Sequence, residues 1–138
     1  MKIKRIAHIG IAVADVKQAG KFYTDIMGQI IDHLEMVDDL KTVFVPLGQT
    51  NLELIQDTTA DGVIARHISK RGEGIQHVAY EVEDIDAALE ELKAKDVRLI
   101  DEVARPGAHN SRVAFLHPKA TNGVLTELVE YPKERLRS

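Results

Sequence analysis

The chain has 138 residues, with 18 Lys and Arg against 22 Asp and Glu, so its formal net charge is −4. That length suits one domain, or two small halves that share a core. Residues 1–69 and residues 70–138 each carry −2, which excludes a basic face for nucleic acid. The lack of cysteine excludes disulfides, thiolate metal sites and a cysteine nucleophile. Because no apolar run reaches the ~20 residues of a membrane span, we expect a cytoplasmic protein with no membrane partner.

The first half of the chain predicts one strand, one helix and three further strands. An alternating β-branched strand over 4–14 leads to Asp15, which is placed to cap a helix over 16–27 that Gly28 ends. Strands are then expected at 29–37, 41–47 and 50–56, with Gly48 in a turn.

The second half predicts the same order of elements. A strand over 74–82 leads to Asp84 and a helix over 85–95, and strands follow near 97–103, 112–116 and 124–130. A linker over 61–73, helical over 61–70, joins modules of about 1–60 and 74–138. The predicted fold class is α+β, with two βαβββ modules forming one domain of residues 1–138 and a curved mixed sheet around a metal cleft.

The two halves also match residue by residue. His8 aligns with His77, Asp15 with Asp84, and Glu53 with Glu127. Two histidines and two glutamates therefore recur at corresponding positions of an internal repeat.

These four residues predict a metal site. Side chains alternate along a strand, so His8 points away from Ile9 and Ile11, whose apolar side chains suit the helix-packed face. A carboxylate among apolar strands is costly to bury unless it is paired, protonated or bound to metal. Two imidazoles and two carboxylates suit one divalent ion such as Co, Zn, Ni or Mn.

Each of these four residues, taken alone, could have a purely structural role. A single strand histidine is usually structural, and a Glu between two Leu residues is usually on an edge strand facing solvent. The pairwise match across the repeat favours ligands. His33 and His67 have no partner under the repeat and are interpreted as surface residues, whereas His117 precedes Pro118 and suits either a substrate contact or a turn.

The chain resembles the vicinal oxygen chelate (glyoxalase/bleomycin resistance) superfamily, and within it the methylmalonyl-CoA epimerases. The matching stretches are Ile6–Val13, Gly72–Ala79, Phe115–Lys119 and Gly123–Leu128. The resemblance implies metal ligands at His8, Glu53, His77 and Glu127, with Glu127 also an acid or base. It places Ser111 and Arg112 in a substrate loop, with His117 and Lys119 as further substrate contacts, and it implies an acyl-CoA substrate and a homodimer.

The chain departs from the epimerases in ways that keep alternatives open. Thr42 stands where some epimerases carry a Glu thought to be the second base, and a hydroxyl cannot serve as that base. Glu53 stands where several have Gln, which gives the ligand set of glyoxalase I. Lactoylglutathione lyase is therefore the alternative activity, and a metal-free binding protein of the same fold is a third possibility.

The resemblance implies removal of the proton α to a thioester, an enolate, and return of a proton to the other face. Because Thr42 cannot act as a base, the sequence leads to the hypothesis that Glu53 serves one face and Glu127 the other.

Overall fold

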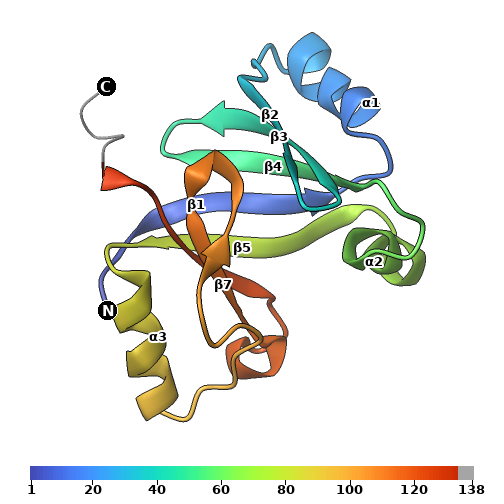
Figure 1. Ribbon diagram of the computed structural model, residues 1–138. Helices are drawn as coiled ribbons and strands as arrows, with labels where there is room; N and C mark the ends of the chain where they lie inside the picture. Colours follow the sequence, from blue (N-terminus) through green and yellow to red (C-terminus); the bar gives the residue numbers. More distant parts are fainter. Residues whose placement is uncertain (134–138) are drawn as a thin grey trace. The chain divides into compact units, whose positions relative to one another are not determined.

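The computed structural model describes residues 1–133, in which the order strand, helix and three strands occurs twice (Figure 1). The first set is β1 (Ile3–Ala12), α1 (Val16–Lys21) continued by the π-helical turn η1 (Phe22–Ile26), β2 (His33–Val37), β3 (Leu40–Leu47) and β4 (Thr50–Asp57). Helix α2 (Val63–Arg71) follows. The second set is β5 (Gly74–Val82), α3 (Ile85–Ala94), β6 (Arg105–Pro106), the 3-10 turn η2 (Ala108–Asn110), β7 (Arg112–Leu116), the 3-10 turn η3 (Pro118–Thr121) and β8 (Thr126–Glu130). The predicted α+β class is confirmed.

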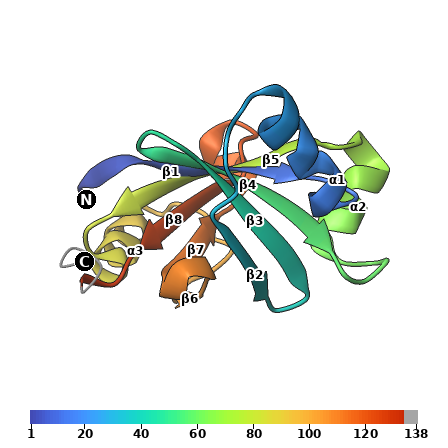
Figure 2. The ribbon, with the colours of Figure 1, turned by 90° about the horizontal axis from the view of Figure 1, so that it is seen from above.

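The chain divides into two compact units. The His8 unit is His8–Gln76, and the His77 unit is Met1–Ala7 with His77–Ser138, of which the structure describes the part up to Lys133. In the His8 unit the strands run β2-β3-β4-β1, with β1 parallel to β4 and the other pairs antiparallel. Figure 2 shows β2, β3 and β4 side by side. In the His77 unit the strands run β5-β8-β7-β6 with the same pattern of directions. Each unit therefore contains a mixed sheet with the same order and directions of strands.

Helices cover the apolar faces of the His8 unit. Asp15 Oδ1 accepts from the amides of Lys17 and Gln18, which fixes the start of α1. Val16 of α1 then packs on Val43 and Leu54. Helix α2 packs separately, and its core cluster is Ile64 with Ala12 and Ile55, bordered by Ile68 and Leu40.

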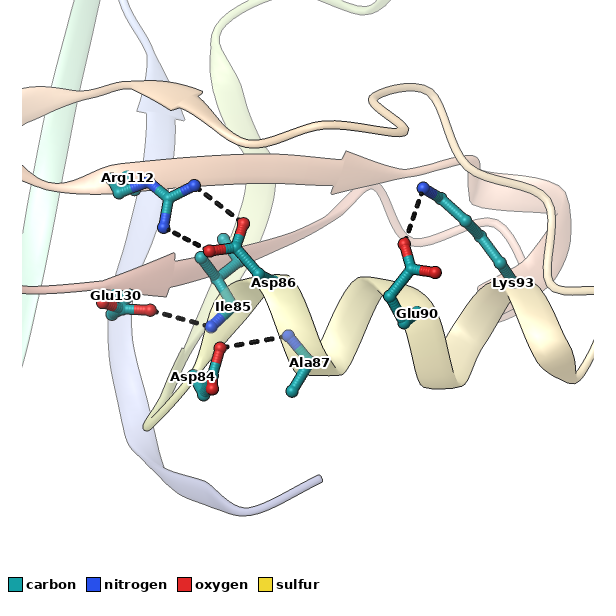
Figure 3. A network of polar contacts seen from close by, with 8 residues as sticks. All are labelled: Asp84, Ile85, Asp86, Ala87, Glu90, Lys93, Arg112 and Glu130. Atoms are coloured by element: carbon teal, nitrogen blue, oxygen red, sulfur yellow. Dashed lines mark hydrogen bonds and ion pairs between the residues drawn. The ribbon is translucent and has the colours of Figure 1, made fainter.

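Helix α3 covers the sheet of the His77 unit. Asp84 Oδ1 accepts from the amide of Ala87 at 3.0 Å, and Glu130 of β8 accepts from the amide of Ile85 at 2.8 Å (Figure 3). One buried face of the helix forms the core with three strands; the cluster is Val82, Ile85, Ala88, Leu89, Leu92, Ala114, Leu116 and Leu128. Both predicted caps and both predicted helix starts are confirmed.

The strand predicted over 97–103 is wrong. Only an isolated bridge between Leu99 and Leu116 forms there, and the ladder resumes in the two residues of β6. The carboxylate of Asp101 accepts from the amide of Phe115 at 2.8 Å, so a side chain takes the place of a backbone partner. Pro106 then ends the edge strand because it has no amide to donate.

The helix predicted over 16–27 is α-helical only to Lys21. It widens into η1, where the amide of Met27 donates to the carbonyl of Phe22 at 3.1 Å. A Cβ at Gly20 would lie 2.7 Å from Ile31 Cδ1, so the following segment packs tightly against α1. The strand predicted from residue 29 accordingly begins at His33. Within residues 1–133, none of the helices is long and apolar enough to span a bilayer.

Candidate functional site

The His8 unit pairs an imidazole with a carboxylate. Gly10 lies opposite Glu53 in the parallel pair of β1 and β4, so His8, two residues earlier, shares its face with Glu53. His8 Nε2 is 3.3 Å from Glu53 Oε1, and both residues are less than a tenth exposed. The ring of Phe44, the β3 partner of Glu53, meets the His8 ring edge-on at 6.4 Å between centroids.

The His77 unit repeats this arrangement. Ala79 lies opposite Glu127 in the parallel pair of β5 and β8, and His77 Nε2 is 3.0 Å from Glu127 Oε1. Phe115 is the β7 partner of Glu127, and its ring meets the His77 ring edge-on at 5.4 Å. His77 and Glu127 are 3% and 6% exposed. The repeat seen in the sequence therefore extends to side-chain geometry.

The donor atoms in each unit fit a divalent ion. Nitrogen and oxygen ligands about 2.0–2.2 Å from one ion, at tetrahedral or octahedral angles, lie about 3 Å apart. The separations of 3.3 Å and 3.0 Å agree with that spacing. A buried carboxylate needs a compensating positive charge, which an ion or a protonated imidazole supplies. His8, His77 and Glu127 all combine burial with donor atoms that divalent metals prefer.

The expected substrate residues fall into different surroundings. Ser111 is 5% exposed, precedes β7 and alternates in phase with Val113 and Phe115, so it shares the face of Glu127. Its carbonyl accepts from the amide of Gly107 at 3.0 Å. A Cβ at Gly107 would lie 2.9 Å from Ser111 Oγ, so the loop needs glycine at this position.

His117 has a turn role in the described structure. Its Nδ1 accepts from the amide of Lys119 at 3.0 Å and so caps η3, while the Lys119 side chain is exposed. Desolvation and the positive charges of Arg98 and Lys119 lower the pKa of His117.

Arg112 lies on the other face of β7. It alternates with Val113 and Phe115, and both of its terminal nitrogens donate to the carboxylate of Asp86 at 2.7 Å (Figure 3). This hydrogen-bonded pairing lowers the pKa of Asp86 and raises that of Arg112. The geometry does not support the expected substrate role of Arg112, because its guanidinium is directed toward α3.

Arg105 carries a cation on the Glu127 face and was not singled out in the sequence. It pairs with Val113 in β6 and β7, which puts it in phase with Phe115. Its guanidinium carbon lies 5.6 Å from the centre of the Phe115 ring, and its Nε donates to Asp101 at 3.3 Å. Without the register of this short edge strand, the sequence gives no signal for its orientation.

His33 differs from the surface residue that the sequence suggested. Its side chain is 36% exposed, its Nε2 lies 2.7 Å from Glu35 Oε1, and its ring lies 5.8 Å from that of Phe44. The pair therefore belongs to the same face of the sheet as Glu53. His67, the other histidine interpreted as a surface residue, is half-buried on α2.

A family model matches this chain over residues 7–115, and it describes the glyoxalase/bleomycin resistance protein/dioxygenase superfamily. The chain belongs to this superfamily. The family resemblance drawn from the sequence is thereby confirmed.

The similar proteins of this superfamily include named epimerases. A mitochondrial methylmalonyl-CoA epimerase of Mus musculus is 38% identical over 130 residues, covering 92% of this chain and 73% of that protein. The crystal structure of methylmalonyl-CoA epimerase from Mycobacterium tuberculosis is 37% identical with a TM-score of 0.91, covering 99% of this chain and 93% of that one. A methylmalonyl-CoA epimerase in complex with methylmalonyl-CoA and NH4+ is 33% identical with a TM-score of 0.91, covering 96% and 97%.

Proposed function

We propose that this chain epimerises methylmalonyl-CoA and that it holds one divalent ion through His8, Glu53, His77 and Glu127. The observation that carries the proposal is the duplicated pair of buried His and Glu side chains, with separations of 3.3 Å and 3.0 Å. The named epimerases among the similar proteins favour this reaction over the lyase reaction.

The ion, when bound, supplies Lewis-acid stabilisation for the negative charge that develops on the substrate oxygens. The protein supplies neutral imidazoles and anionic carboxylates to hold it, in sites that exclude most water. Phe44 and Phe115, each packed edge-on against a ligand histidine, restrict the rotation of the imidazoles.

Glu127 is the proposed base on one face of the substrate. It is 6% exposed, so little water competes for its carboxylate, and a carboxylate in this position accepts the α-proton as the thioester forms its enolate. Glu53 is the base on the opposite face in the hypothesis drawn from the sequence.

The proposed substrate contacts come from the loop and edge strand beside β7. Arg105 is the proposed partner for an anionic group of the acyl-CoA, because its guanidinium stacks on Phe115 beside Glu127. Ser111 is proposed as a hydroxyl donor from the same face, and the exposed Lys119 as a contact for a phosphate.

The test is an NMR assay of the purified protein with methylmalonyl-CoA in deuterated water, beside an assay with methylglyoxal and glutathione. We expect deuterium at the α-carbon and interconversion of the epimers, lost on chelation and restored by added divalent ion. Higher turnover of the glutathione hemithioacetal would instead identify a lactoylglutathione lyase. If the protein binds either substrate but turns over neither with any divalent ion tested, it is a binding protein.

We also propose a homodimer, which the resemblance implies, and a cytoplasmic location, which the composition of the chain suggests. Light scattering on the purified chain tests the oligomeric state, and fractionation of the source cells tests the location.

A further inference from the structure

Strand β2 carries an imidazole and a carboxylate that the proposed metal site does not use. His33 and Glu35 are two residues apart and so point to the same side of the strand. Their Nε2 and Oε1 atoms are 2.7 Å apart, a short charge-assisted hydrogen bond. The side chains are 36% and 30% exposed, so both can exchange protons with water.

Strand register puts this pair on the face of the His8 unit that carries Glu53. His33 lies opposite Phe44 in β2 and β3, and Phe44 lies opposite Glu53 in β3 and β4. Neighbouring strands are about 4.8 Å apart, so the Cα atoms of His33 and Glu53 are separated by about 10 Å. Phe44 lies between them, with its ring 5.8 Å from that of His33 and 6.4 Å from that of His8.

Glu35 is the cross-strand partner of Thr42. The Thr42 hydroxyl, 2% exposed, donates to the backbone carbonyl of Glu35 at 2.9 Å, so Thr42 fixes β2 against β3. Opposed side chains in a sheet have Cβ atoms about 5 Å apart. An ionisable side chain, that of Glu35, therefore lies one strand away from Thr42.

Epimerisation requires a proton-transfer group on each face of a planar enolate. Glu53 is 8% exposed and lies 3.3 Å from His8, which suits a ligand. The His33–Glu35 pair is ionisable, hydrogen-bonded and open to water. We infer, on the basis of the proposed function, that His33 rather than Glu53 transfers the proton on the second face and that Glu35 positions its ring.

Each turnover moves one proton onto one of the two groups, Glu127 and His33, and one proton off the other. In one direction the Glu127 carboxylate takes the α-proton, and the electrons of the C–H bond pass into the enolate. Protonated His33 then gives its Nε2 or Nδ1 proton to the opposite face of the α-carbon, and the enolate electrons form the new C–H bond. Glu127 is left protonated and His33 neutral, so before the next turnover Glu127 releases its proton to solvent and the half-exposed His33 takes up a proton from water. The reverse direction uses the same groups with their roles exchanged.

The test uses the metal-loaded protein and its variants His33→Gln, Glu35→Gln and Glu53→Gln, with His67→Gln as control. Each is incubated in deuterated water with (2R)- and (2S)-methylmalonyl-CoA separately, and NMR follows both inversion and α-deuterium. We expect His33→Gln to keep its metal and to lose inversion by roughly 10²- to 10⁴-fold, the range typical of a general acid–base group. It should still exchange the α-proton of one epimer with retention through Glu127.

Glu35→Gln should lose less inversion than His33→Gln, with the same one-epimer exchange, because it removes only the group that orients the ring. His67→Gln should invert within a few-fold of the unsubstituted protein, whereas loaded Glu53→Gln should still exchange the α-protons of both epimers. Inversion by His33→Gln at near the unsubstituted rate would overturn the inference, as would one-epimer exchange in loaded Glu53→Gln. If the unsubstituted protein neither inverts nor exchanges either epimer, the proposed function fails, and the inference fails with it.

Discussion

His77 Nε2 lies 3.0 Å from Glu127 Oε1, in a pair of side chains that are 3% and 6% exposed. At this distance, the two atoms can share either a proton or a metal ion. The two cases differ in metal content, which can be measured directly.

The first prediction concerns that content. We expect about one Co, Zn, Ni or Mn ion per chain, measured by elemental analysis after growth with each metal. His77→Ala should lose most of the ion because it removes a ligand and leaves the buried Glu127 uncompensated. His67→Ala, which changes a half-buried histidine of α2, should keep it. A fully loaded His77→Ala protein would contradict the ligand assignment.

The sequence was sufficient to predict the duplicated pairs. The repeat aligned His8 with His77 and Glu53 with Glu127, and strand alternation placed His8 on the face away from α1 and His77 on the face away from α3. The parallel register of β1 with β4, and of β5 with β8, then brings each Glu beside its His. Asp15 and Asp84 were recognisable because an N-cap depends on local sequence alone.

The edge strands could not be predicted in the same way. His33 and Arg105 lie on β2 and β6, whose register depends on turns and side-chain contacts that sequence periodicity does not encode. Beside β7, the side chain of Asp101 also accepts from the amide of Phe115, in place of a backbone carbonyl. The orientation of Arg112 could have been predicted from the sequence, because strand alternation places it on the face opposite Phe115. The family resemblance instead placed it in the substrate loop.

The second prediction concerns the caps. Asp84→Ala should lower the free energy of unfolding by about 1 kcal/mol, because the amide of Ala87 loses its acceptor at 3.0 Å. Urea unfolding followed by circular dichroism measures the change. The matched control is Glu90→Ala on the same helix, whose contact within residues 1–133 is an i,i+3 pair with Lys93 (Figure 3), and it should change stability by less than half as much. Equal losses would show that Asp84 contributes by charge rather than as a cap.

The third prediction concerns the turn at His117. Its pKa is lowered from the usual 6.5 by desolvation and by Arg98 and Lys119, so the neutral ring that accepts from the Lys119 amide is favoured in the folded state. A lowered histidine pKa means that this contribution is fully present above pH 6.5 and is lost as the pH falls through the lower folded value. The NMR shift of the Lys119 amide should therefore titrate with a midpoint below pH 6.5. A midpoint above pH 6.5 would contradict the capped arrangement.

The last prediction compares two arginines on opposite faces of the same sheet. Arg105→Ala should raise KM for methylmalonyl-CoA by roughly 10-fold or more, since a charge-assisted contact contributes about 1.5–3 kcal/mol, and should change metal content little. Arg112→Ala breaks a solvent-exposed ion pair with Asp86 on the face away from Glu127, so its KM should stay within two-fold. Arg105→Lys keeps the charge but loses the planar stacking on Phe115, and should give an intermediate KM. Steady-state kinetics at saturating metal separates the three. If Arg105→Ala and Arg112→Ala raised KM equally, the substrate would not bind preferentially on the Glu127 face of the sheet. A larger effect of Arg112→Ala would instead move the anion contact to the α3 side of β7.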